Sequence, residues 1–134
     1  MTFLYTQAQE KQPAKVDTCL AKEKCIHVYV ATWCPACKQS KQVLKIFGDY
    51  LIENPQQQVG IRIFVGPDQA DAIAMADEIG NTAVVDKNNY YKKTARPQAV
   101  PNFKVTNRKG EIIQTQEGIL RNASPQQFLE WLQI

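Results

Sequence analysis

The sequence lacks the features that mark membrane-spanning and nucleic-acid-binding proteins. No apolar run approaches the ~20 residues that a membrane-spanning helix needs. Lys and Arg number 16 against 13 Asp and Glu, and they form no basic run interleaved with aromatic residues. A net charge of +3 spread in this way indicates a solvated surface. We therefore predict neither a membrane span nor a nucleic-acid partner.

The start of the chain has no cationic segment followed by an apolar one, as a signal peptide would have. Residues 6–15 are polar and rich in Gln, Lys and Pro, which is typical of a tail or tether. We predict a polar tail over residues 1–15 and one domain over residues 16–134. Two interpretations stay open: a cytosolic protein, or a chain whose upstream signal or anchor has been removed.

Four cysteines are present, and all lie in the first third of the chain as Cys19, Cys25, Cys34 and Cys37. A disulfide scaffold usually spreads its cysteines, so local chemistry is favoured. A zinc site would need two ligands beyond a Cys-x-x-Cys pair, and the chain has a single histidine, His27. The spacing of Cys19 and Cys25 is also wider than a usual zinc knuckle, so we predict no metal.

The first half of the chain predicts a strand, a helix and a second strand. Residues 26–32 (IHVYVAT) are rich in β-branched and aromatic residues, and residues 58–65 alternate, as buried strands do. Apolar residues at helical spacing predict a helix over residues 36–52, opened by Pro35. Strands joined in this way run parallel. Upstream, Asp17 or Thr18 is a candidate helix cap.

The second half predicts another helix, a hairpin and a last helix. Asp68 is a candidate cap for a helix that ends at Gly80, and residues 83–85 are a short apolar piece. Residues 86–98 are polar and predict a loop or an extended excursion. Residues 103–106 and 111–115 predict two strands joined by a turn. Ser124-Pro125 opens a final helix with Phe128, Leu129 and Leu132 on one face.

The motif WCPACK at residues 33–38 follows the first predicted strand and opens a helix. A Cys-x-x-Cys pair beside a strand–helix–strand unit is typical of redox proteins. Thiolate is the reactive form of cysteine, and the free N–H groups of a helix start favour negative charge. We predict that Cys34 is the exposed nucleophile and that Cys37 is the buried resolving thiol. Trp33 is expected to be a partly exposed lid rather than a core residue.

Residues 27–41, with this motif at their centre, resemble the active site of the thioredoxin superfamily, and the order of elements is similar to that fold. The resemblance implies an α/β thioredoxin-like fold with a central mixed β-sheet and helices on both faces. It implies an enzyme that exchanges disulfides with protein substrates and an upstream redox partner, with no cofactor beyond the redox-active disulfide. It also implies a cis-proline facing the pair, for which Pro101 is favoured over Pro97. The implied substrate groove comprises Trp33, Pro35, Ala36, Val100 and Pro101.

The sequence departs from classical thioredoxin at two places. Val28 stands where that protein carries a buried acid, so the proton acceptor for Cys37 is open: water, or a group from elsewhere. The dipeptide between the cysteines is Pro-Ala, which is closer to glutaredoxins and to periplasmic disulfide-exchange proteins. His27 is adjacent to Val28, but the alternation of side chains along a strand turns it to the opposite face of the sheet. We therefore expect His27 to be a surface or strand-end residue.

The first cysteine pair and the resemblance together suggest a cellular compartment and whether the enzyme reduces or oxidises its substrates. Cys19 and Cys25 are either a local disulfide or two incidental thiols, and the disulfide is favoured. A disulfide favours an oxidising compartment, hence a periplasmic or other extracytoplasmic location, with the cytoplasm as the alternative. Trp-Cys-Pro-x-Cys resembles periplasmic reductases, so we expect a monomeric reductase. An isomerase, an oxidase, or an interaction module docking through residues 86–98 remains an alternative.

Overall fold

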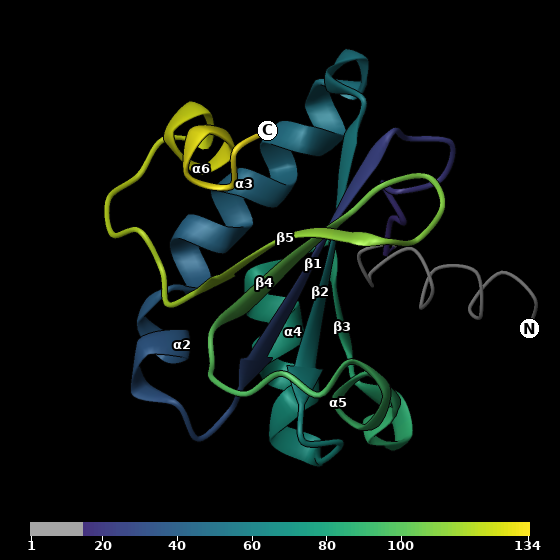
Figure 1. The fold of residues 1–134 in the computed structure, drawn as a ribbon. Helices are drawn as coiled ribbons and strands as arrows, with labels where there is room; N and C mark the ends of the chain where they lie inside the picture. Colours follow the sequence, from purple (N-terminus) through teal and green to yellow (C-terminus); the bar gives the residue numbers. More distant parts are fainter. Residues whose placement is uncertain (1–14) are drawn as a thin grey trace, which may run out of the picture.

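The computed structural model describes residues 15–134, and the predicted tail lies outside the described residues except for Lys15. Five strands form one mixed sheet in the order β3-β2-β1-β4-β5 (Figure 1). The central strand β1 (Lys24–Ala31) runs parallel to β2 (Val59–Gly66) and antiparallel to β4 (Asn102–Thr106). The edges are β3 (Ala83–Val85) and β5 (Ile112–Glu117). The predicted parallel unit and hairpin are confirmed.

Alternation along β1 gives the sheet two different faces. Ile26, Val28 and Val30 are fully buried on one face, where they join the main apolar core. His27 and Tyr29 project from the other face, because successive side chains of a strand point to opposite sides. The core face is covered by α3 (Lys41–Glu53), α4 (Ala70–Ile79) and α6 (Pro125–Trp131), whose apolar side chains belong to that core.

The opposite face carries α5 (Tyr90–Ala95). Tyr91 stacks on Phe64 of β2, with ring centroids 4.4 Å apart. It also stacks on Tyr29 of β1, at 5.9 Å. The mixed sheet with helices on both faces, expected for a thioredoxin-like fold, is therefore confirmed.

The loop predicted over residues 86–98 is wrong. This stretch contains a 3₁₀ turn, η2 (Lys87–Asn89), followed by the helix α5. The buried carboxylate of Asp86 accepts hydrogen bonds from the backbone N–H groups of Tyr91 at 2.7 Å and Lys92 at 3.0 Å. These bonds satisfy donors that a helix start leaves free. Residues 86–98 therefore do not form the free docking loop considered for an interaction module.

The helix predicted over residues 36–52 is two helices, α2 (Pro35–Gln39) and α3, with Ser40 between them. The Ser40 hydroxyl donates to the carbonyl of Cys37 at 2.9 Å. A serine side chain that bonds the preceding turn competes with regular helical bonding, which explains the break. The break leaves α2 as a single short turn that carries the cysteine motif.

Two predicted helix caps are wrong. Asp17 and Thr18 begin a turn and no helix, and the Asp17 carboxylate accepts from the N–H of Cys19 at 3.0 Å. Asp68 does not cap α4, because its carboxylate accepts from the N–H of Asn88 at 2.7 Å. The cap of α6 is confirmed, since Ser124 and Gln127 form a reciprocal capping box.

Candidate active site

The cysteine motif lies just beyond the carboxyl end of β1. Cys34 is the N-cap of α2, and its Sγ accepts a hydrogen bond from the backbone N–H of Cys37 at 3.2 Å. Pro35 occupies the first helical position, where its missing N–H costs nothing. Both thiols are free. This geometry places a backbone donor on the sulfur of Cys34, where negative charge would develop.

The two cysteines differ little in exposure. Cys34 is 4% exposed and Cys37 is fully buried. The expectation of an exposed Cys34 is therefore corrected, although Cys34 remains the more accessible of the two. Cys34 is buried because the segment before β4 lies over it. The Cys34 thiol points at the carbonyl of Val100 in that segment, with Sγ and O 3.8 Å apart.

That segment contains the candidate proline. The Val100–Pro101 peptide bond is cis, and Pro101 is buried. Pro97, the competing candidate, is not at a cis bond. The Gly66–Pro67 bond is also cis. Sequence reasoning missed this second cis bond.

The remaining groove candidates lie at the surface around the pair. Trp33 is 65% exposed, so it is not a core residue. Pro35 is exposed, and Ala36 and Val100 are half-buried. A groove of about 520 Å³ adjoins Ala36 between α2, the first turns of α3 and residues 119–123. Sequence reasoning missed this groove, because nothing local indicates that residues 119–123 return to the cysteine helix.

The proton chemistry of Cys37 is set by its surroundings. Burial, and then the hydrogen bond with Cys34, raise the pKa of the Cys37 thiol well above its ordinary value. Val28, at the position of the thioredoxin acid, is fully buried and apolar. Cys37 is therefore held protonated, and a proton must leave it before it can attack a disulfide.

Cys19 and Cys25 are joined by a disulfide at the opposite end of β1. Thr18 fixes this loop to β2, because its Oγ1 donates to the carbonyl of Ile61 at 3.0 Å and accepts from its N–H at 2.7 Å. Gly60 permits the contact, since a Cβ there would lie 2.4 Å from the carbonyl oxygen of Thr18. The two sulfurs are thus bonded to each other and are not free as metal ligands.

His27 lies on the sheet face away from the cysteine motif, as predicted. Its Nε2 is 3.0 Å from Oγ1 of Thr106. Burial, and then the charge of Arg62, lower the pKa of His27. Among residues 15–134, no three His, Cys, Asp or Glu side chains gather as a metal site would require. No helix in that same range is both long and apolar enough to cross a membrane.

Comparison with known proteins gives the fold class. No family model and no curated protein matches the chain. Solved structures do match, including StoA from Bacillus subtilis, at 24% identity, with 81% of each chain covered and a TM-score of 0.61. The exposed lipoprotein thioredoxin Etrx1 of Streptococcus pneumoniae matches at 16% identity, over 84% of this chain and 85% of that one, with a TM-score of 0.61.

A secreted disulfide oxidoreductase of Mycobacterium tuberculosis matches at 13% identity, over 84% of this chain and 83% of that one, with a TM-score of 0.57. The chain therefore has a thioredoxin-like fold. At these identities the activity has to be argued from the chemistry of the site itself.

Proposed function

We propose that the chain is an enzyme that exchanges disulfides with protein substrates through Cys34 and Cys37, chiefly as a reductase. The observation that carries this proposal is the pair of free thiols at the start of α2, with the N–H of Cys37 on the sulfur of Cys34. A hydrogen-bond donor at this position stabilises a thiolate, which is the attacking form.

The exchange has two steps. The Cys34 thiolate attacks one sulfur of a substrate disulfide, the substrate S–S bond breaks, and the other sulfur leaves as a thiolate. Cys37 then loses its proton and attacks Sγ of Cys34 in the mixed disulfide; the bond between Cys34 and the substrate breaks, and the second substrate sulfur leaves as a thiolate that takes up a proton. The substrate leaves with two thiols, reduced by two electrons, and the chain holds a Cys34–Cys37 disulfide. An upstream dithiol partner restores the two thiols.

The proton of Cys37 goes to the departing substrate thiolate or to water. The pKa of Cys37 is raised by burial, and Val28 supplies no acceptor. A substrate thiolate released beside the pair can take up this proton, so its release couples the first step to the second. In a site with a resident buried acid, that acid would accept the proton of Cys37; here the acceptor is the substrate thiolate or water.

Substrates are expected to lie over the exposed groove residues Trp33 and Pro35 and against Val100 and Pro101. The test is a trapping experiment with oxidised insulin. Cys37→Ser should accumulate a mixed disulfide through Cys34, because the resolving thiol is missing. The matched variant Cys34→Ser should accumulate none. Equal trapping by both variants would contradict the assigned roles.

The reducing direction rests on the resemblance of the Trp-Cys-Pro-x-Cys motif to periplasmic reductases. Equilibration of Cys34 and Cys37 with glutathione buffers would measure the reduction potential. A value near the thioredoxin end of the family range, about −270 mV, is expected. A value near about −120 mV would replace the reductase by an oxidase.

An extracytoplasmic location belongs to the same proposal. Its support is the Cys19–Cys25 disulfide, since disulfides persist in oxidising compartments. Among the matching structures, Etrx1 is described as an exposed lipoprotein and the mycobacterial protein as secreted. We propose that residues 1–15 are a tether and that the domain is monomeric. Lys15, the last residue of that segment, donates a hydrogen bond from its ammonium to the carbonyl of Gly80 at 3.0 Å.

A further inference from the structure

Basic side chains form a row across the sheet face that lacks α3, α4 and α6. In the strand register, His27 of β1 lies opposite Arg62 of β2 on one side and opposite Lys104 of β4 on the other. Burial lowers the pKa of His27, so at neutral pH the charge of the row lies on Arg62 and Lys104, one on each side of the neutral imidazole.

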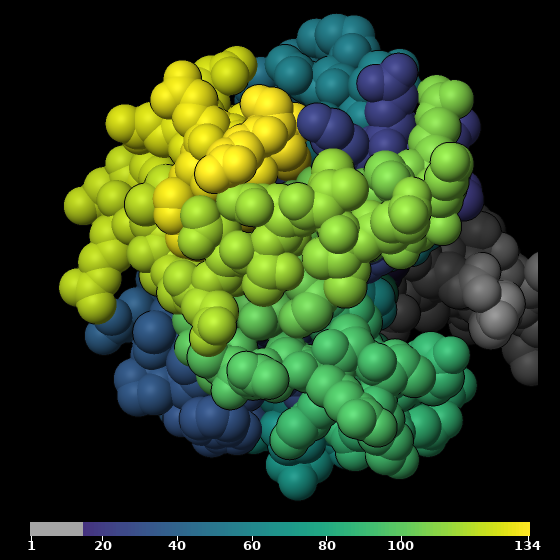
Figure 2. Space-filling model, in the orientation of Figure 1, coloured from purple at the N-terminus to yellow at the C-terminus, as the bar shows by residue number. Residues whose placement is uncertain are grey.

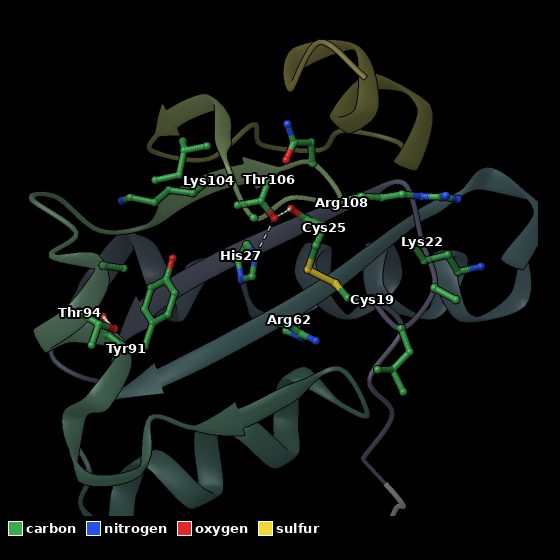
Figure 3. Close-up of a pocket in the computed structure, with 16 residues that line it drawn as sticks. Cys19, Lys22, Cys25, His27, Arg62, Tyr91, Thr94, Lys104, Thr106 and Arg108 are labelled. Carbon is green, nitrogen blue, oxygen red and sulfur yellow. Dashed lines mark hydrogen bonds between the residues drawn. A yellow bond between two sulfur atoms is a disulfide. The ribbon is translucent and has the colours of Figure 1, made fainter.

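The row lines a cavity of about 810 Å³, within the size range of ligand-binding sites. Its walls are the Cys19–Cys25 disulfide, one side of α5 and the hairpin between β4 and β5 (Figure 3). In Figure 2 the hairpin (yellow-green) and the segment around α5 (green) both lie on this face, and residues of both line the cavity. Lys22 and Arg108 add further positive charge, and no Asp or Glu lines the cavity.

Counter-charges within the protein meet only part of this row. Asp17 pairs with Arg62 through two hydrogen bonds, of 3.0 and 2.8 Å. Lys104 donates to the amide oxygen of Asn102 at 2.7 Å, which occupies one of its three N–H groups. Glu117, opposite Asn102 in the register, is the acid that acts on Lys104. No described side chain forms a hydrogen bond or ion pair with the Arg108 guanidinium.

Tyr91 supplies a second and independent observation. Its hydroxyl is the one buried side-chain polar atom of residues 15–134 that has no hydrogen-bond partner. Stacking on Phe64 holds the ring in place, so the hydroxyl cannot turn out to solvent freely. In Figure 3 it points toward the side of the cavity where Lys104 lies. A buried donor without a partner is unusual in a native protein and calls for an explanation.

We propose that this cavity binds an oxyanion, a carboxylate or phosphate group, that accepts a hydrogen bond from Tyr91 and lies against Lys104 and Arg108. The bound group supplies the counter-charge that the cavity wall lacks and the partner that Tyr91 lacks. Charge-assisted bonds of this type are the strong ones, and partial burial at Lys104 strengthens them. The group belongs either to a free small molecule or to an acidic segment of another protein.

This site is separate from the cysteine pair. It lies toward the start of β1 and on the face opposite Val28, whereas Cys34 follows the end of β1. Anion binding therefore does not depend on the proposed redox activity. Either proposal can fail while the other stands.

The test is an amide NMR titration of the full chain with two probes, inorganic phosphate and a tetraglutamate peptide. Saturable shifts centred on residues 91 and 104 are expected with at least one probe. Saturation by phosphate alone identifies a small free anion, and saturation by the peptide alone identifies an acidic protein segment. Shifts that do not saturate with either probe would overturn the proposal.

Three variants make the test specific. Lys104→Gln should weaken binding about fivefold or more, and Tyr91→Phe, which removes only the hydroxyl, about threefold. Lys93→Gln is the matched control, because Lys93 is an exposed residue of α5 outside the cavity lining and loses the same charge. Equal weakening by Lys93→Gln and Lys104→Gln would show non-specific charge attraction and would refute the site.

Discussion

The two cysteine pairs lie at opposite ends of β1 and are in different chemical states. Cys19 and Cys25 are bonded, whereas Cys34 and Cys37 are free. Burial does not separate them, because all four side chains are at most 9% exposed. What separates them is the backbone around each sulfur. The second pair opens a helix and has an N–H on its first sulfur, while the first closes a loop against β2.

The largest difference is expected in activity. Cys34→Ser should reduce disulfide exchange to background, because a hydroxyl does not replace a thiolate nucleophile. The double variant Cys19→Ser/Cys25→Ser should stay within about twofold of the unaltered protein, because distant sites act independently. Dithiothreitol-driven insulin reduction measures both. Full activity in Cys34→Ser would assign the chemistry to another group.

For stability, we expect the Cys19–Cys25 disulfide to matter more than the free pair Cys34 and Cys37. The double variant Cys19→Ala/Cys25→Ala should lower the free energy of unfolding by about 2 kcal/mol, the loop-closure value for so short a loop. Urea unfolding of the two proteins measures the difference. Adding a reductant should destabilise the unaltered protein by a similar amount and leave the double variant unchanged. An unchanged midpoint would mean that Thr18 alone holds the loop on β2.

Alkaline pH should act at the other end of the strand. Burial and the bond with Cys34 raise the pKa of folded Cys37 above its unfolded value of 9.0. The folded state therefore keeps a proton that the unfolded state releases. The resulting stability is present below pH 9.0 and is lost as pH rises above it, by at most about 1.4 kcal/mol per pH unit.

Urea unfolding of the reduced protein at about pH 8 and about pH 10 measures this loss of stability. The two pH values lie about one unit below and above the unfolded pKa of Cys37. Cys37→Ala should lose less stability over the same interval. Equal losses in the two proteins would show that Cys37 does not carry the dependence.

The smallest effect is expected at His27, beside the disulfide. Burial, and then the charge of Arg62, lower the pKa of folded His27 below 6.5, against the opposing charge of Asp17. Its neutral form therefore stabilises the fold above pH 6.5, and this contribution is lost as pH falls below 6.5. We expect less than about 1 kcal/mol.

Thermal unfolding between neutral and mildly acidic pH, compared with His27→Gln, measures this contribution. Lys104 and Tyr91 face the same histidine and are unchanged in the variant. The variant should lose less stability on acidification than the unaltered protein. A larger loss in the variant would reverse the sign of the expected effect.

Local patterns predicted the parts of the fold that depend on near neighbours along the chain. Richness in β-branched and aromatic residues located β1, alternation located β2, and Ser124-Pro125 located α6 with its capping box. The prediction failed at residues 86–98, because the helix there depends on a buried carboxylate and on Tyr91 packing against Phe64. It also failed at Ser40, where one side-chain hydrogen bond interrupts a regular apolar pattern.

The sequence by itself determined the cysteine motif, its place between a strand and a helix, and the two faces of β1. These follow from residue type and from periods of about two and 3.6 residues, which are local properties. Only the tertiary structure decided that Val100 faces Cys34 across 66 positions of chain, and that Arg62, His27 and Lys104 share one row. Strand order and register bring distant segments together, and both depend on how the whole core packs.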